Sequence, residues 1–244
     1  MTLVTLGQSG LSWAAEVDRG RLQSAEQRLT EGNAAASAQD YTKAIGLYQE
    51  GLKLLEESAG GQRVSDAPPE LRTQYSGMSL ELTRNCIIMH FQNGQVLAKQ
   101  GKEKIEKAVQ LAQQTQRKDP ALIKEAGGDL QEAARYFDLT LQLIENLAVN
   151  APENKTALDQ HVRFVSSWPT APSQSGAMGF SEYYRGGCYF NLAMIAAYLG
   201  AGKEEQGYIG KLSSLGQPEL EKAYKQVKLE ADRILGALYP SQEL

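Results

Sequence analysis

The stretch AEQRLTEGNAAASAQDYTKAIGLYQEGLKL, residues 25–54, has the sequence pattern from which the fold of the whole chain is predicted. Its apolar and small residues recur every three or four positions on both sides of Asp40. This spacing is typical of two amphipathic helices that each turn one face toward a core. Gly32 and Ala44 are small enough to let paired helix backbones approach, and Tyr48 would fill the space beside them. The stretch therefore predicts a helical hairpin with its turn near Asp40.

The same stretch resembles a tetratricopeptide repeat (TPR). That family's pattern is W-x2-L-G-x2-Y followed by A-x3-F, on a helix-turn-helix unit of about 34 residues. Gly32 holds the glycine position, and Ala44 with Tyr48 supplies A-x3-F at the right distance. Three positions depart from the pattern, where the family has tryptophan, leucine and tyrosine: Arg28, Glu31 and Ala35.

Partial copies of this motif recur along the chain. The resemblance implies an all-α protein, a single TPR-like right-handed α-solenoid of helical hairpins over residues 16–244 with a C-terminal capping helix. The expected hairpin units are residues 22–58, 69–117, 119–150 and 180–215, and the expected capping helix is 218–239.

Glycines mark the expected turns inside the later units. In the second unit Gly94 takes the place of the repeat glycine, and Gly101 follows it at the distance at which the repeat has its turn. We therefore expect a long helix over residues 69–100 and a turn at Gly101. In the third unit the turn is expected at Gly128, followed by A-x3-F spacing. In the last unit Gly200 takes the turn position.

Three segments lie outside these units. Residues 154–168 have helical spacing of their apolar residues and predict a further helix. Residues 168–179, WPTAPSQSGAMG, predict a long loop, and loops of this length inside a domain are usually functional or mobile. Residues 1–15 are interpreted as a flexible leader. A truncated export signal is the alternative, because Ser12-Trp13-Ala14 resembles a signal-peptidase site.

The composition narrows the classes of function. With 42% hydrophobic and 22% charged residues, the chain is an ordinary globular protein. A net charge of -4 argues against nucleic acid as a partner, because that surface needs clustered Lys and Arg. No run of about 18 apolar residues is present, so no transmembrane segment is expected. We expect a cytoplasmic protein, with export as the alternative.

Few residues are suited to catalysis or to metal binding. Cys86 and His90 lie one helical turn apart, but a closed zinc site needs four ligands. Cys86 and Cys188 are expected to be small buried hydrophobes, since free Cys is among the most buried residue types. The glycines at Gly46 and Gly200 do not form a phosphate loop, which needs GK[ST] in a strand-to-helix turn. We therefore expect no enzyme activity, no metal and no cofactor.

The TPR resemblance also implies a binding surface. In that family the first helices of successive repeats line a concave groove that takes an extended or helical partner segment. Carried over position by position, the expected peptide-binding residues are Leu29, Asn33, Phe91, Gln95, Phe190 and Met194. Apolar anchors combined with amides suit a neutral or amphipathic peptide. Because Leu29 stands where the family's carboxylate clamp has a lysine, recognition of chaperone C-termini is not expected.

The alternative for the three larger side chains is a place in the core. An aromatic residue or methionine at helical spacing usually packs inward, and this applies to Phe91, Phe190 and Met194.

These patterns predict a non-catalytic scaffold or adaptor that binds a protein or peptide partner. One alternative is a self-associating structural protein, a homo-oligomer. Another is a module resembling the three-helix microtubule-interacting-and-trafficking family, which has a similar D-Y-x2-A-x3-Y hairpin at Asp40. An enzyme would need a pocket with convergent polar groups and perturbed ionisable residues.

Overall fold

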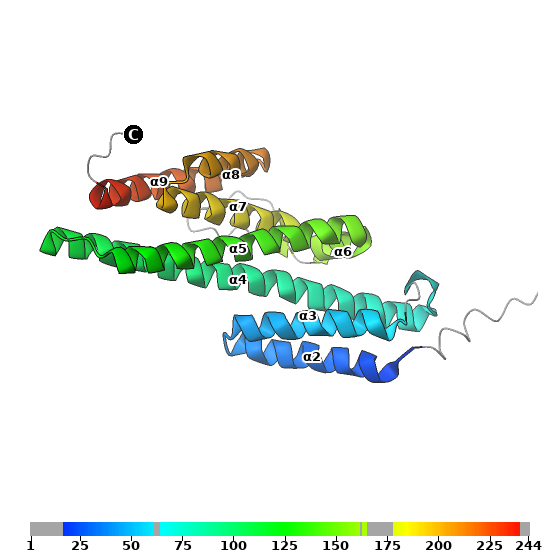
Figure 1. Ribbon diagram of the computed structural model, residues 1–244. Coiled ribbons are helices and arrows are strands. Elements are labelled where there is room, and N and C mark those ends of the chain that lie inside the picture. The colour runs from blue at the N-terminus through cyan, green and yellow to red at the C-terminus, as the bar shows by residue number, and fades with distance from the viewer. Residues whose placement is uncertain (1–16, 61–63, 162, 165–177, 240–244) are drawn as a thin grey trace, which may run out of the picture. The chain divides into compact units, whose positions relative to one another are not determined.

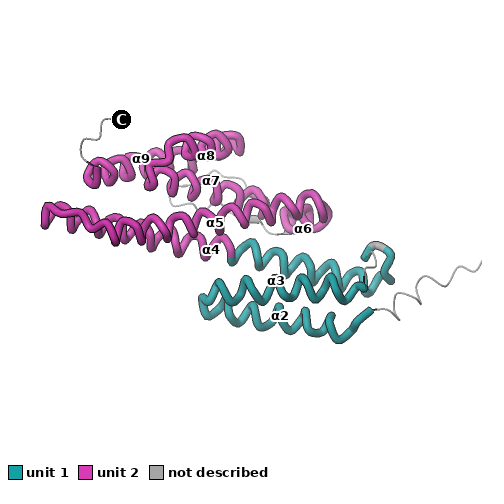
Figure 2. Tube along the Cα trace, viewed as in Figure 1, with its two compact units in different colours: residues 1–89 teal, residues 90–244 magenta. Residues whose placement is uncertain are grey.

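The computed structural model describes residues 17–60, 64–161, 163–164 and 178–239. These residues are almost entirely helical (Figure 1), which confirms the predicted all-α class. The chain divides into two compact units, Met1–Met89 and His90–Leu244 (Figure 2). The expectation of one domain over residues 16–244 stays a prediction, and the expected leader lies outside the described residues.

The predicted first hairpin is present as helices α2 (Arg19–Ser37) and α3 (Tyr41–Ser58). An aspartate caps each helix. The carboxylates of Asp18 and Asp40 each accept a hydrogen bond from the backbone N–H three residues further on. Such caps satisfy donors that the first turn of a helix leaves unpaired.

Gly32 of α2 faces Tyr48 of α3. A Cβ atom on Gly32 would overlap the Cε1 atom of the Tyr48 ring, so only glycine fits there. Tyr48 and Ala44 are both buried. The predicted packing of small residues around Tyr48 is confirmed.

The first unit is completed by a 3-10 turn, η1 (Val64–Asp66), and by residues 69–89 of helix α4 (Pro69–Thr115). Leu82 of α4 is fully buried and faces Gly51 of α3, where a Cβ atom would lie 2.9 Å from Leu82 Cδ2. In the part of this unit that the structure describes, three α-helices pack together.

Helix α4 continues for 47 residues, so the predicted turn at Gly101 is wrong. Gly94 and Gly101 are instead the close-contact positions between α4 and α5 (Pro120–Asn150). A Cβ atom on Gly94 would lie 3.0 Å from the Phe137 ring, and one on Gly101 would lie 2.7 Å from Leu130 Cγ. In sequence, a glycine at a close helix contact looks the same as a glycine at a turn.

Helix α5 is also unbroken, over 31 residues, so the predicted turn at Gly128 is wrong. The Asp119 carboxylate accepts hydrogen bonds from the backbone N–H groups of Ala121 and Leu122 in the first turn of α5, and Pro120 has no N–H that would need an acceptor. Gly94 of α4 faces Phe137 of α5, whereas Gly101, further along α4, faces Leu130, which comes earlier in α5. The two helices therefore run antiparallel. The expected hairpins at residues 69–117 and 119–150 are therefore one long helix each.

The segment after α5 departs from the prediction as well. Helix α6 (Pro152–His161) ends earlier than the helix expected over residues 154–168. Strand β1 (Arg163–Phe164) pairs antiparallel with β2 (Met178–Gly179). Three of the four residues in the sequence VRFV, residues 162–165, are β-branched or aromatic, which favours extended structure. The expected loop at residues 168–179 lies outside the described residues, apart from β2.

The last expected hairpin is present as α7 (Phe180–Leu199) and α8 (Gly202–Ser214). Gly200 has φ of 69°, the left-handed conformation that glycine adopts most easily, so the predicted turn is confirmed. The expected terminal helix is α9 (Pro218–Leu238). Its function as the cap of a solenoid stays a prediction.

Helix α7 is the centre of the second unit. It contacts α5, α6, α8 and α9, and most of its side chains are buried. Fully buried positions include Phe180, Cys188 and Ala193. Among the helices that the structure describes, none is long and apolar enough to cross a membrane.

Candidate functional site

A groove of about 540 Å³ runs between α2 and α3 in the first unit. The last turns of α2 and the first turns of α3 form its walls. The lining residues are Glu31, Ala34, Ala35, Ala38, Asp40, Lys43 and Leu47.

The groove exists because α2 carries alanine where a larger side chain would fill the space between the helices. Ala34 and Ala38 are exposed, whereas Ala35 is buried. Leu47 on α3 is half-buried and forms the apolar wall opposite. The alanine-rich run of residues 34–38 is the signal for this groove in the sequence, and the repeat pattern does not predict it.

Charges of both signs lie at the edge of the groove. Arg28 Nε is 3.0 Å from Glu50, and the Arg28 guanidinium also donates to Glu31. Hydrogen bonds from Gln27 and Arg28 lower the pKa of Glu31, and the charge of Lys43 lowers it further. The groove thus combines an apolar floor with an ionised carboxylate on α2 and an ammonium group on α3.

Two of the residues expected to bind peptide, Leu29 and Asn33, do not line this groove. The Asn33 side-chain oxygen accepts hydrogen bonds from the Tyr48 hydroxyl at 2.8 Å and from the Asn85 amide at 3.0 Å. Burial raises the pKa of Tyr48, so the hydroxyl remains a donor at neutral pH. Asn33 therefore connects the three helices of the first unit. Leu29 is half-buried.

Of the residues expected in the second unit, Phe91 belongs to the core. It is 4% exposed and packs edge-on against Phe137 at 5.5 Å and Tyr184 at 5.1 Å between ring centroids. Its expected place in an open groove is therefore wrong, because the interior takes up the aromatic ring.

The other three expected residues of this unit have more solvent contact. Gln95 is exposed on α4, and Phe190 and Met194 are half-buried on α7. None of the three lines the groove of the α2–α3 hairpin. Their part in binding stays a prediction.

A second hollow, of about 520 Å³, lies where α6 meets the start of α7 in the second unit. One of its lining residues is Asp159, which accepts a hydrogen bond from the Ser181 N–H at 2.7 Å and pairs with Lys155. Burial opposes ionisation of Asp159, but the hydrogen bonds from Lys155 and Ser181 outweigh it and lower the pKa. Because Asp159 is engaged in this way, it joins α6 to the N-terminus of α7.

The cysteines have the expected structural character. Cys86 and Cys188 are free and buried. Burial raises the pKa of Cys86 to about 12 and that of Cys188 well above its usual value. Since the thiolate is the reactive form, both side chains are inert at neutral pH. Among the described residues no group of three His, Cys, Asp or Glu is placed to hold a metal ion.

A buried carboxylate joins α8 to α9, which the sequence did not predict. Glu205 is 3% exposed and accepts a hydrogen bond from the Tyr224 hydroxyl at 2.6 Å. Lys228 Nζ lies 3.5 Å from its other oxygen. Burial and the hydrogen bond to Glu205 raise the pKa of Tyr224. In the sequence Glu204-Glu205 looks like an ordinary solvated pair, so the contact appears only in the fold.

The burial of His90 predicts that the stability of the protein depends on pH. It is 3% exposed, next to Tyr136, and burial lowers its pKa to about 4, with a contribution from the charge of Arg135. The unfolded chain binds this proton near pH 6.5, so stability is lost as the pH falls from about 6.5 to about 4. We expect wild type to lose about 2 kcal/mol relative to His90→Phe over this interval.

Urea unfolding of both proteins at several pH values measures this difference. Because both proteins contain the same carboxylates and the same second histidine, His161, the comparison isolates His90. A difference that stays constant between pH 6.5 and 4 would show that His90 is not held neutral by the fold.

Comparison of the chain with protein-family models, with curated proteins and with solved structures gives no match. The function therefore has to be inferred from the grooves and contacts of the molecule. Of these, the groove of the α2–α3 hairpin combines open apolar surface with charged edges.

Proposed function

We propose that the protein is a non-catalytic scaffold or adaptor that binds a segment of a partner protein in the groove of the α2–α3 hairpin. The observation that carries this proposal is the open space above Ala34, Ala35 and Ala38, faced by Leu47. A helical partner segment can bind in such a space between two helices by inserting an apolar side chain. Its polar residues then meet Glu31 on one side and Lys43 on the other.

We also propose that the helices are arranged as a TPR-like solenoid in the cytoplasm. The hairpins α2–α3 and α7–α8 support the arrangement, since Gly32 sits at a close crossing and Gly200 at a left-handed turn. The long helix pair α4–α5 departs from the repeat pattern. The two free cysteines fit a reducing compartment.

The resemblance to the microtubule-interacting-and-trafficking module remains a second candidate. It is favoured by the three helices of the first unit, α2, α3 and residues 69–89 of α4. In both proposals the first unit binds a partner and does not catalyse a reaction, so one experiment addresses both.

The test fills the groove and asks whether binding is lost. A phage-displayed library of random peptides is selected on the wild-type chain, and the selected peptides are then measured against Ala34→Arg/Ala38→Arg. Both alanines are exposed, so the new side chains occupy the groove without disturbing the core. Gln142→Arg/Asn146→Arg, at two exposed positions of α5 with the same four-residue spacing, is the matched control.

We expect the selected peptides to bind wild type and Gln142→Arg/Asn146→Arg alike and to bind the filled groove at least about tenfold more weakly, a loss of roughly 1.4 kcal/mol. Circular dichroism of the three proteins confirms equal helicity. Equal binding to all three proteins would assign the peptides to another surface and would reject the groove as the binding site.

A further inference from the structure

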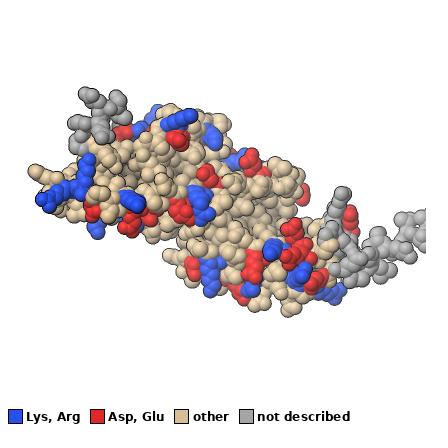
Figure 3. Space-filling view, in the orientation of Figure 1, with Lys and Arg blue, Asp and Glu red and all other residues tan. Residues whose placement is uncertain are grey.

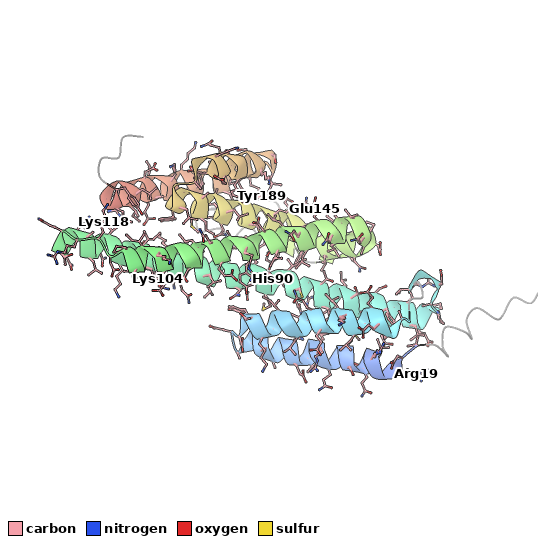
Figure 4. All side chains as sticks on the ribbon, in the orientation of Figure 1. Arg19, His90, Lys104, Lys118, Glu145 and Tyr189 are labelled. Carbon is pink, nitrogen blue, oxygen red and sulfur yellow. The ribbon has the colours of Figure 1, made fainter. Side chains whose placement is uncertain are left out.

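The end of the α4–α5 hairpin, which we call the basic tip, differs in charge from the rest of the chain. Residues 107–124 contain four cationic side chains and one carboxylate, a net charge of +3 in a chain whose net charge is -4. The cations are Lys107, Arg117, Lys118 and Lys124, and all four are exposed. Figure 4 labels Lys118 at this end of the hairpin, and Figure 3 shows blue side chains gathered at the same end.

These cations are not used in the ion pairs that neutralise lysines nearby on the same helices. Lys102 lies 3.0 Å from Glu230, and Lys104 lies 2.7 Å from Asp129. For the four cations of the basic tip, no carboxylate of the described residues lies within 4.0 Å. The single carboxylate of the tip, Asp119, is already hydrogen-bonded to backbone N–H groups.

Helix dipoles do not account for the cluster. A cation is favoured near a helix C-terminus, and this describes Arg117 and Lys118 just after α4. Lys124 is the fifth residue of α5 and Lys107 lies two turns before the end of α4, so both are beyond the terminal turns where a helix dipole acts. The dipoles therefore account for only two of the four cations.

Apolar and amide side chains accompany the charges. Leu111 and Ile123 are half-buried on the two helices. Four glutamines of the tip are exposed: Gln110, Gln113, Gln114 and Gln116. Glutamine amides offer donors and acceptors to a peptide backbone. Cations, apolar contacts and amides together suit a protein segment better than a lipid surface.

We propose that the basic tip binds an acidic segment of a partner protein, one with carboxylates and a few apolar side chains. The positive charge of the tip attracts such a segment and speeds its association, and the contacts with Leu111 and Ile123 hold it. This surface belongs to the second unit and is separate from the groove of the α2–α3 hairpin.

The test uses a fluorescein-labelled helical peptide with glutamates on one face and leucines on the other. Its binding to the full-length chain at low salt is compared with binding to Arg117→Glu/Lys118→Glu. The control is Lys222→Glu/Lys225→Glu on α9, which makes the same change of charge at two exposed lysines. We expect the tip variant to bind at least about tenfold more weakly and the control to bind like wild type, with salt weakening the wild-type complex.

Four results would overturn this proposal. Wild type that fails to bind the acidic peptide at low salt contradicts it directly. Equal losses of peptide binding in the tip variant and the control would show that binding depends on the net charge of the protein and not on the tip. Binding of phosphatidylserine vesicles in place of the peptide, or tip-dependent self-association seen by light scattering, would assign the tip to a different occupant.

The two binding proposals fail separately. Ala34→Arg/Ala38→Arg is expected to bind the acidic peptide like wild type, because the filled groove lies in the other unit. Loss of acidic-peptide binding in this variant would contradict the assignment to the tip.

Discussion

Replacing Phe137 with alanine is expected to lower the free energy of unfolding by about 3 to 5 kcal/mol. Phe137 is fully buried at the contact between α4 and α5, against Phe91 and the backbone at Gly94. Alanine removes most of the ring's contacts and leaves a cavity, because the two long helices cannot move together at this point alone. Urea unfolding followed by circular dichroism measures the loss.

The matched control for this change is Val149→Ala on the same helix. Val149 is 73% exposed, so its truncation should alter the free energy of unfolding by no more than about 0.5 kcal/mol. If Phe137→Ala were as mild as the control, the ring would not lie in the core of the second unit.

Replacing Gly101 with leucine is expected to destabilise the protein by about 3 kcal/mol. Its Cβ atom would lie 2.7 Å from Leu130 Cγ and 3.0 Å from the backbone oxygen of Ala126. A flexible side chain can move aside, but the backbone of α5 cannot, so the helices must separate. The thermal midpoint and the urea midpoint should both fall.

Gly128→Ala is the companion experiment, because it distinguishes a helix from a turn. Nothing lies within 4 Å of the position that a Cβ atom on Gly128 would occupy, and the residue is inside α5. Alanine should therefore stabilise the protein by about 1 kcal/mol through its higher helix propensity. Destabilisation at this position would instead support the turn that the repeat pattern places there.

Local sequence predicted the fold well wherever a helix is limited by its own residues. Asp40 caps α3, Gly200 ends α7, and Pro218 begins α9, and each boundary was predicted. These signals depend on the backbone and on neighbouring residues within one turn. Tertiary contacts are not needed to interpret them.

The turns predicted in the middle of the chain are wrong because glycine occurs both at turns and at close contacts between helices. Gly94 and Gly101 keep the spacing of a repeat and its turn, yet both lie inside α4 against side chains of α5. Whether a glycine bends a chain or admits a neighbouring helix depends on the partner helix. That information is absent from the local sequence.

The candidate binding residues show the same limit. Phe91 has the spacing of a groove residue and of a core residue, and the rings of Phe137 and Tyr184 enclose it. Ala34 and Ala38 carry no functional group, so the groove that they leave open was not predicted. A binding surface made of small side chains is defined by the space between two elements.

By itself, the sequence determined that this chain is helical, where its first and last hairpins lie, and that its two cysteines are buried. Helix periodicity and capping are encoded within a few residues, and burial follows from apolar character. Only the tertiary structure decided that α4 and α5 are long unbroken helices, that Glu205 is buried against Tyr224, and that a groove opens above Ala34. These outcomes depend on contacts between segments far apart in the chain. The energies of such contacts cannot be inferred from the local sequence.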